Sequence, residues 1–310
     1  MSAKKQIQVD VDKAVGFKYP SDKVAYNRRD LLLYAAGLNL EEPKFTYELD
    51  KQFAAFPTYP LVLPLKGATS DVNSYAERSN TGGEIPGMPK IDLNRLVHGE
   101  QYLELLEPLP LQGEFTLDST LAGVYDAGKG MIMDRETFLV DASGKKLARM
   151  ISSAFVIGYG GFGGPRKPKP SNVVDTPKRA PDAVQESKTH TNQALLYRLS
   201  GDYNPLHADP RIGERLGMKG AILHGLCTYG IAATAVLRHF ADNNPAAFKS
   251  IYGRFASPVY PGETLQTLMW KAGEQNGQVT VAFMTKVKER DGVVISNGTV
   301  VLVPGAKSKL

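Results

Sequence analysis

The sequence holds almost no cysteine: Cys227 is the only one among 310 residues. A lone thiol excludes an intramolecular disulfide and a metal site built from several thiolates. Long apolar runs are also missing, since no stretch approaches the ~18 consecutive apolar residues of a membrane-spanning helix. The segment Met1 to Asp12 is polar and mixed in charge, unlike a signal peptide or an Arg-rich transit peptide. We therefore expect an intracellular protein without a membrane span.

A strong excess of one charge is absent as well, because 37 Lys and Arg stand against 32 Asp and Glu, a net charge of +5. Cations suit nucleic acid, acidic lipid or coenzyme A. Here they are scattered, apart from Arg166 to Lys169 and the Lys307 and Lys309 tail, and do not interleave with aromatic residues as in nucleic-acid-binding modules. We predict a mildly basic, solvated surface and no nucleic-acid partner.

Glycine and proline divide the chain near its middle. Residues 158–164 are rich in Gly, and residues 165–181 mix Pro, Lys and Asp with little apolar periodicity, which is typical of a linker. The predicted organisation is an N-terminal domain, a linker, a C-terminal domain and a tail, over residues 1–164, 165–184, 185–305 and 306–310.

The two domains share short patterns, which indicates a duplication. Pro108 to Leu117 and Pro258 to Leu265 each place a proline-bounded turn and a Gly-Glu pair before a β-rich stretch. Leu33 to Gly37 resembles Tyr197 to Gly201, but the first copy continues with an apolar residue where the second has Asp202. We therefore expect the first copy to lack the polar chemistry of the second.

The second domain predicts one buried helix and a set of strands. Asn192 to Ser200 has apolar residues at helical spacing. Leu226 to Phe240 predicts a longer helix, apolar over a wide surface and therefore buried. Strand-like stretches follow at residues 250–256, 264–270, 278–287 and 292–303. A sheet wrapped round one buried helix is the hot-dog architecture.

The equivalent helix of the first domain, expected within Gln52 to Leu65, meets Pro57, Pro60 and Pro64. Each proline inside a helix removes a hydrogen bond and clashes with the preceding turn, at a cost of ~3 kcal/mol. We predict that no continuous helix forms there. The apolar room left under the sheet could hold a fatty acyl chain, or a repacked loop could fill it.

The candidate active site is the run Gly201-Asp202-Tyr203-Asn204-Pro205-Leu206-His207. An Asp–His pair can take a proton from water and deliver a proton to carbon. Asn204 could hold the geometry by donating to Asp202 or by accepting from the water. The alternative is an Asx-type turn that leaves His207 at the surface.

A second candidate element is Ile222-Leu223-His224-Gly225-Leu226, at the start of the predicted buried helix. A helix N-terminus presents unpaired N–H groups and partial positive charge. Gly225 lacks a Cβ, so a thioester oxygen could approach its N–H closely. The N–H would then form an oxyanion hole, which often stabilises a transition state by ~3 kcal/mol or more. The alternative is a glycine required only for helix–sheet packing.

Other chemistries are disfavoured. The run Gly158 to Gly163 fits G-x-G-x-x-G, but prolines follow it where a nucleotide-binding motif opens a helix. A metal site at Asp202, His207 and His224 lacks paired His-x-x-x-His spacing, so we expect no metal. We expect Cys227 to be a small buried residue and not a nucleophile. The sequence has no Gly-x-Ser-x-Gly motif that would indicate a serine hydrolase.

The motifs together closely resemble the 2-enoyl-CoA hydratase 2 family, a branch of the MaoC-like dehydratases. This branch includes the hydratase unit of peroxisomal multifunctional enzyme type 2 and stand-alone plant-type hydratases. The similarity covers nearly the whole chain and is carried by Tyr197 to His207, Ile222 to Gly225, Leu96 to Leu105, Gly160 to Gly164 and Arg254 to Leu265.

The resemblance implies an α+β double hot-dog fold, whose incomplete N-terminal copy accommodates the acyl chain, and a homodimer. It implies hydration of trans-2-enoyl-CoA to (3R)-3-hydroxyacyl-CoA in fatty acid β-oxidation, with one water supplying both added groups. No cofactor is implied, because coenzyme A is part of the substrate. The implied catalytic residues are Asp202, His207, Asn204 and Gly225; the implied substrate-binding residues are His98, Gly99, Tyr203, Pro205, Leu206, Phe255 and Lys129.

Three positions qualify this picture. His98-Gly99 is not a second helix start, because the residues that follow alternate like a strand. Lys129 is assigned as a basic contact because this chain has Ala127 where a relative carries lysine. Ala221 stands where proline is usual, which leaves the His224-Gly225 pair intact.

The chain ends Ser308-Lys309-Leu310, the form of a peroxisomal address read by an import receptor. We therefore expect the peroxisomal matrix. Three alternatives stay open: a dehydratase for branched or sterol-derived 3-hydroxyacyl-CoA, a non-catalytic acyl-CoA binding module, and a hot-dog thioesterase. Acyl-chain profiling, binding without turnover, and release of free coenzyme A would distinguish them.

Overall fold

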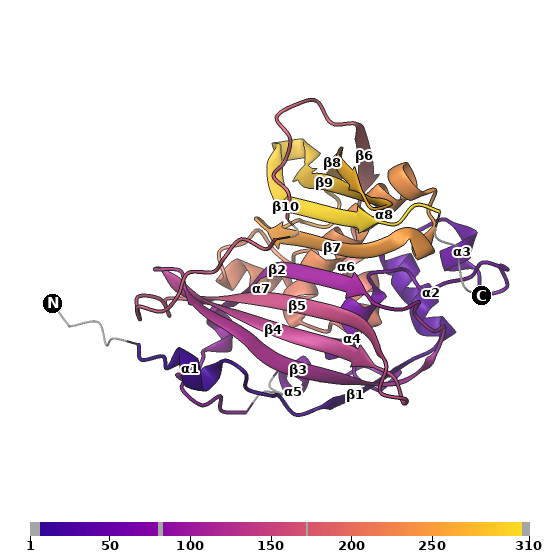
Figure 1. The fold of residues 1–310 in the computed structure, drawn as a ribbon. Coiled ribbons are helices and arrows are strands. Elements are labelled where there is room, and N and C mark those ends of the chain that lie inside the picture. Colours follow the sequence, from indigo (N-terminus) through magenta and orange to yellow (C-terminus); the bar gives the residue numbers. More distant parts are fainter. Residues whose placement is uncertain (1–6, 80–82, 172, 306–310) are drawn as a thin grey trace.

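One antiparallel sheet of ten strands forms the frame of the molecule (Figure 1). The computed structural model describes residues 7–79, 83–171 and 173–305. The strands are β1 Asp22–Tyr26, β2 Leu96–Leu105, β3 Gly113–Asp126, β4 Gly130–Val140, β5 Lys146–Ile157, β6 Ala183–Lys188, β7 Phe248–Phe255, β8 Thr264–Gln275, β9 Gln278–Val287 and β10 Gly292–Leu302. The tail Ser308 to Leu310 lies outside the described residues, so the structure bears on nothing predicted for it.

The sheet consists of two halves with the same strand order. Its sequence of neighbours is β1-β3-β4-β5-β2-β7-β10-β9-β8-β6, so β1 corresponds to β6, β3 to β8 and β2 to β7 when each half is read inward from its edge. The central pair β2 and β7 joins the halves, from Glu100 opposite Arg254 to Glu104 opposite Ser250. The two proline-bounded turns of the sequence lead into β3 and β8, which occupy equivalent places.

The helices lie on the concave side and at the ends of the sheet. The α-helices are α1 Val11–Ala14, α2 Arg28–Gly37, α3 Pro43–Thr46, α4 Leu63–Lys66, α5 Tyr75–Ser79, α6 Gln193–Tyr197, α7 Pro210–Arg215 and α8 Gly225–Ala241. The 3-10 helices are η1 Tyr59–Val62, η2 Leu93–Arg95, η3 Arg198–Ser200, η4 Pro205–His207, η5 Pro245–Ala247 and η6 Lys288–Arg290. The stretch predicted as one helix over Asn192 to Ser200 is therefore α6 continued by η3.

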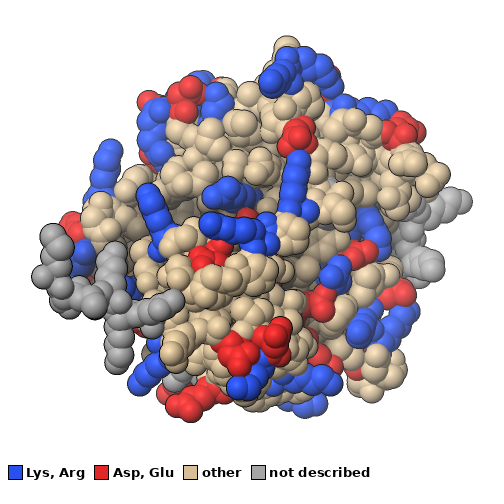
Figure 2. Space-filling view, turned by 60° about the vertical axis from the view of Figure 1, so that its left-hand side comes forward, with Lys and Arg blue, Asp and Glu red and all other residues tan. Residues whose placement is uncertain are grey.

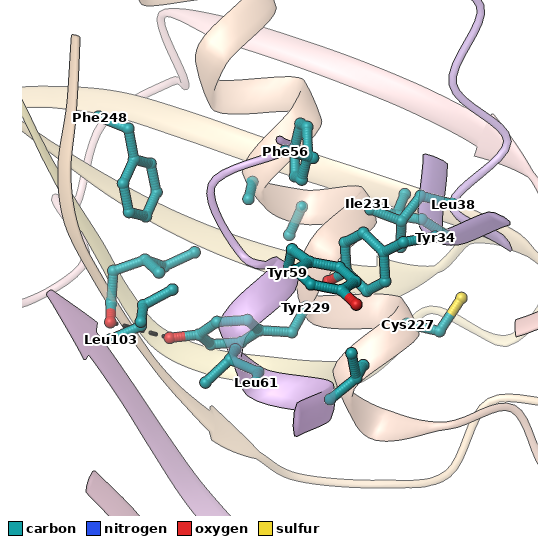
Figure 3. Close-up of a cluster of buried hydrophobic side chains, with 14 of the residues drawn as sticks. Tyr34, Leu38, Phe56, Tyr59, Leu61, Leu103, Cys227, Tyr229, Ile231 and Phe248 are labelled. Atoms are coloured by element: carbon teal, nitrogen blue, oxygen red, sulfur yellow. Dashed lines mark hydrogen bonds between the residues drawn. The ribbon is translucent and has the colours of Figure 1, made fainter. Parts of the chain in front are cut away.

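Helix α8 is the buried helix that the sequence predicts. Small and branched apolar residues fill its middle, and an unbroken run from Cys227 to Leu237 is buried. Its Tyr229 hydroxyl donates to the backbone oxygens of Gln101 at 3.0 Å and Ile251 at 2.8 Å, on β2 and β7 (Figure 3). The hydroxyl therefore ties the helix to the junction between the two halves, and its buried oxygen keeps a hydrogen-bond partner.

No continuous helix forms over Gln52 to Leu65, as the three prolines predict: η1 and the single turn α4 are the helices there. The segment instead turns its side chains into the core, where Phe56, Tyr59 and Leu63 are almost fully buried. Figure 3 shows Phe56 and Tyr59 beside α8. Tyr59 meets the ring of Tyr34 edge-on, with centroids 5.4 Å apart. Of the two expected possibilities, this structure shows the repacked segment filling the room under the sheet.

The glycine-rich stretch between the halves folds around a carboxylate of the protein. The Asp126 side chain accepts the N–H groups of Gly128 at 2.7 Å, Gly161 at 3.0 Å and Gly163 at 2.8 Å. These bonds, that of Gly161 first, lower the pKa of Asp126. The described residues between β5 and β6 form no helix or strand. The G-x-G-x-x-G run thus opens no helix, as predicted, and two of its N–H groups already bind an anion.

The surface is mixed in charge. Figure 2 shows Lys and Arg side chains spread over one face with acidic side chains among them. Among the described residues, none of the helices is both long and apolar enough to span a membrane.

Candidate active site

The loop from Gly201 to His207 is a pair of successive Asx turns. The Asp202 carboxylate accepts the Asn204 N–H at 3.1 Å, and the Asn204 side-chain oxygen accepts the Leu206 N–H at 3.0 Å, capping η4. An Asx-type turn with His207 at the surface is the alternative to an active site that the sequence left open. The turn is present, but it directs His207 inward, where only 8% of the residue is exposed.

The Asn204 side chain makes its hydrogen bond within its own loop. Its oxygen is engaged by the Leu206 N–H, and the contact to Asp202 comes from the Asn204 backbone. Local Asx bonds of this kind compete with longer-range contacts, because the donor two residues onward is always within reach. Asn204 therefore shapes the loop from within.

Hydrogen bonding fixes the tautomer of His207. Its Nδ1 lies 2.8 Å from the backbone oxygen of Ile222, which can only accept, so Nδ1 carries the proton. The lone pair is then on Nε2. Burial lowers the pKa of His207, although the nearby Asp202 charge opposes the shift. The ring is therefore neutral at neutral pH and has a basic nitrogen free.

Asp202 shares this enclosed space. Its side chain is 14% exposed, and burial raises its pKa, against the opposing effects of His207 and the Asn204 N–H. One ligand atom each from Asp202, His207 and His224 lie within 4.8 Å of one another. The charge of Asp202 contributes to the pKa shift of His207, and that of His207 to the pKa shift of Asp202, so the titrations of the two groups depend on each other.

These three residues also resemble a metal-ligand set. However, the His207 and His224 rings stack face to face, with centroids 3.7 Å apart and planes at 27°. His207 Nδ1 and His224 Nε2 are both occupied by backbone oxygens, at 2.8 and 3.1 Å. Bonds from imidazoles to backbone oxygens occur in acid–base centres and in metal sites alike, and here they fix the orientation of both rings.

Gly225 stands at the first position of α8, directly after the buried His224. It is exposed, and no described residue accepts a hydrogen bond from its N–H. A Cβ placed there would lie 3.2 Å from two ring atoms of Phe255, closer than ordinary van der Waals contact. Glycine therefore lets the Phe255 ring approach closely, and the exposed, unpaired N–H lies at the positive end of a 17-residue helix.

His98 and Gly99 reach the same place from the central strand β2. A bulge between His98 and Glu100 interrupts the register with β5. His98 Nε2 lies 3.0 Å from Gln101 Oε1 and 3.1 Å from the Ser152 hydroxyl. Its ring meets Phe255 edge-on, with centroids 4.8 Å apart, and burial lowers its pKa to about 4. The ring of Phe255 thus lies between His98 and Gly225, and Gly225 follows His224, which contacts Asp202 and His207.

The other predicted contacts are more dispersed. Tyr203 lies under the Arg198 guanidinium, 4.9 Å from the ring centroid, and lines a pocket of about 200 Å³ shared with the N-terminal half. Pro205 is exposed and Leu206 half-buried. Lys129 is exposed in the turn between β3 and β4, and within the described chain its hydrogen bonds go to Ala127 and Gly158 and not to the loop of Asp202.

Two residues near the pair were not predicted as functional. The sequence places His224 at a helix start and in a disfavoured metal-ligand set, whereas in the structure its ring stacks on His207. Tyr75 comes from α5 of the other half; burial and then the nearby Asp202 charge raise its pKa. The sequence offers a signal for His224 in its place before Gly225, but none for Tyr75, because only the fold brings α5 to this loop.

Two family models match the chain. The MFE-2 hydratase 2 N-terminal domain matches residues 24–158, and the MaoC like domain matches residues 172–293. The peroxisomal multifunctional enzyme type 2 of Mus musculus is 42% identical over 302 residues, which cover 94% of this chain and 38% of the mouse protein. The probable enoyl-CoA hydratase 2 of Dictyostelium discoideum is 39% identical, covering 97% of this chain and 99% of that protein.

Solved structures agree with these matches. A MaoC-like dehydratase from Phytophthora capsici superposes with a TM-score of 0.89 at 41% identity, covering 97% of this chain and all (100%) of that one. A Mycobacterium tuberculosis protein described as a double hotdog fold superposes with a TM-score of 0.60 at 12% identity, over 94% and 97% of the two chains, a likeness of fold alone. The chain therefore has the double hot-dog fold and belongs to the MaoC-like and MFE-2 hydratase 2 family of hydro-lyases.

Proposed function

We propose that the protein adds water to trans-2-enoyl-CoA and forms (3R)-3-hydroxyacyl-CoA, reversibly, with Asp202 and His207 as the acid–base pair. The observation that carries the proposal is the buried, coupled pair beside the exposed, unpaired N–H of Gly225. The name of the Dictyostelium relative supports the substrate class, and the stereochemistry follows the family resemblance.

The protonation states favour a route in which one proton travels through the pair. In the resting site His207 Nε2 lacks a proton, because the ring carries its proton on Nδ1, and the Asp202 carboxylate accepts the Asn204 N–H. As water attacks C3 of the substrate, its proton passes to the pair and its hydroxyl forms the new C–O bond. The pair then delivers that proton to C2. One water molecule thus supplies both added groups, and the pair returns to its starting state.

The N–H of Gly225 would stabilise the charge that develops on the thioester oxygen. Attack at C3 moves electrons through C2 toward this oxygen, which gains enolate character until C2 is protonated. A fixed donor at a helix N-terminus stabilises that charge with little reorganisation. In this proposal the side chains of His98 and Phe255 with Gly99 form one wall of the substrate site, Tyr203, Pro205 and Leu206 form another, and Lys129 serves as a basic contact.

We further propose that residues 185–305 form the catalytic repeat, that residues 165–184 link it to the first, and that residues 1–164 accommodate the acyl chain. In the structure the side chains of Phe56 and Tyr59 occupy the interior of the first half. A long acyl chain would therefore have to displace the η1 segment. Tyr59→Trp is expected to lower kcat/KM, relative to the wild type, more for long than for short enoyl chains. Equal losses at all chain lengths would oppose this arrangement.

A peroxisomal location and a homodimer are proposed as well. The proposed location rests on the name of the mouse relative, a peroxisomal enzyme. The proposed dimer rests on the family resemblance. A fluorescent fusion placed at the N-terminus, compared with the same fusion lacking Ser308 to Leu310, tests the location. Light scattering of the purified protein tests the dimer, and a monomer mass would contradict it.

The proposed reaction is tested by following the loss of enoyl absorbance from trans-2-decenoyl-CoA, with the product passed to a (3R)-specific dehydrogenase. The expected result is rapid turnover coupled to reduction of the nicotinamide. Product accepted only by a (3S)-specific dehydrogenase would overturn the stereochemical assignment. Release of free coenzyme A, or binding by folded protein without turnover, would overturn the reaction itself.

A further inference from the structure

His224 is a buried histidine to which the proposed reaction assigns no step. It is 1% exposed and precedes the first residue of α8. Its Nε2 lies 3.1 Å from the backbone oxygen of Asp202, which can only accept, so Nε2 carries the proton and donates. The other nitrogen, Nδ1, is buried and has no hydrogen-bond partner among the described residues. One edge of the ring is therefore bound to the backbone of the catalytic aspartate.

The face of the same ring supports the catalytic histidine. The His224 and His207 rings stack with centroids 3.7 Å apart and an angle of 27° between planes. Because His207 is also held by Ile222 through Nδ1, the stack and that bond together fix both the position and the rotation of its ring. A single side chain thus contacts both members of the acid–base pair.

His224 can do this only as a neutral ring. Burial lowers its pKa well below the ordinary value, and the charges of His207 and Arg198 act in the same direction. The titratable and charged groups that face it are Asp202, with Oδ2 4.0 Å from Nε2, and also His207, Tyr197 and Arg198. A neutral ring can stay stacked while His207 accepts a proton, whereas two stacked cations would repel.

Two tyrosine rings pack in series against His224. The ring of Tyr197 lies 4.9 Å from His224, and that of Tyr34 lies 5.7 Å from Tyr197. Tyr34 belongs to α2 of the first half, and its hydroxyl shares a 2.8 Å hydrogen bond with Thr58. Both tyrosines are fully buried, and Figure 3 shows Tyr34 lying between Tyr59 and helix α8. Tyr34 of the first half is thereby packed against Tyr197, which contacts His224 in the second half.

We propose that His224 is a positioning residue that holds Asp202 and His207 in their reactive arrangement, by donating to the Asp202 backbone and by stacking on His207. The proposal rests on the hydratase function proposed above. It assigns His224 no proton transfer: its ring stays neutral with the proton on Nε2 through the catalytic cycle.

The first test replaces the ring by a chain that keeps an N–H donor, in His224→Gln. Loss of the stack admits water beside His207 and releases its ring, so kcat falls at least ~10-fold while KM stays within ~3-fold. Rehydration moves the pKa of His207 upward, so the acid limb of the pH–rate profile shifts to higher pH. The matched control is His239→Gln, at the exposed end of the same helix, which keeps wild-type kinetics. A folded His224→Gln protein with unchanged kcat and pH profile would overturn the proposal.

The second test needs no variant and holds even where His224→Gln fails to fold. In wild-type protein labelled with ¹⁵N at histidine, the two ring nitrogens of each histidine report the tautomer and the charge. The expected His224 spectrum is that of a neutral ring protonated on Nε2 across the pH range of activity. A charged ring at neutral pH, or a proton on Nδ1, contradicts the proposal. This reading is independent of turnover, so an inactive wild type would count against the hydratase function and not against the geometry of His224.

Discussion

Lys66 is buried at the contact between the two halves, and its replacement by methionine gives a measurable loss of stability. Its Nζ donates to the backbone oxygens of Ala25 at 2.8 Å and Thr69 at 2.9 Å, and lies 3.5 Å from Asp30 Oδ2. The two charged side chains are 7% and 8% exposed. Lys66→Met keeps the apolar stem but leaves a buried carboxylate without its cation.

Removing one partner of a buried ion pair costs about 3–5 kcal/mol, mainly because the remaining charge is uncompensated. Asp30 retains the N–H of Asn27 at 2.9 Å, so the lower end of this range applies. One kcal/mol shifts Tm by about 2 °C in a chain somewhat shorter than this one. Lys66→Met is therefore expected to lower Tm by about 6 °C in a thermal melt followed by circular dichroism.

Two variants make this expectation specific. Adding Asp30→Asn to Lys66→Met removes the stranded charge, so the double variant should recover part of the loss. Lys169→Met is the control, because it breaks the ion pair with Asp175, whose side chains are 55% and 91% exposed. Exposed pairs contribute about 0–1 kcal/mol to the free energy of unfolding, so its Tm should change little. A Lys66→Met shift below ~2 °C, or a double variant no more stable than the single one, would refute the assigned role of the buried pair.

Three further outcomes follow from the site and the linker. Gly225→Ala keeps the N–H but places a methyl group 3.2 Å from the Phe255 ring, beside the proposed place of the thioester oxygen, so kcat should fall at least ~10-fold; unchanged steady-state kinetics would contradict a close approach of the thioester to this residue. Burial raises the pKa of Asp202, so the folded state favours the uncharged form, and the associated stability is lost as pH rises through the folded pKa. Asp202→Asn should therefore raise Tm at neutral pH, with a gain that shrinks on acidification; a fall in Tm counts against this. Lys167 binds two carboxylates and the Ser153 hydroxyl, all within 2.8 Å, so Lys167→Met should speed proteolysis between β5 and β6, and an unchanged cleavage rate would contradict this anchoring.

The sequence predicts those parts of the fold that depend on local patterns. The buried helix was placed correctly because its apolar surface is continuous over Leu226 to Phe240, and three prolines were enough to predict a broken segment over Gln52 to Leu65. The positions of β7 to β10 follow from alternation and turn residues, whereas the edge strand β6 was not predicted. What fills the space under the first half was not predictable, because it depends on how Phe56 and Tyr59 pack against residues distant in sequence.

The candidate site divides in the same way. Asp202 and His207 lie in one loop, so their proximity could be expected from the sequence. The stack of His224 on His207 depends on the path between Ala208 and Leu223, and the approach of Tyr75 depends on the docking of the two halves. The bond of the Asn204 side chain is local as well, because its oxygen accepts the Leu206 N–H two residues onward.

The central claim is that Asp202 and His207 act as one proton-transfer unit. It is tested most directly by measuring kcat for hydration of trans-2-decenoyl-CoA by Asp202→Asn, by His207→Gln and by the double variant, each shown to be folded. Each single change is expected to lower kcat at least ~100-fold, and the double variant should lose little more than either, because one unit cannot be removed twice. Losses that multiply in the double variant, or a single variant that retains wild-type turnover, would contradict the account.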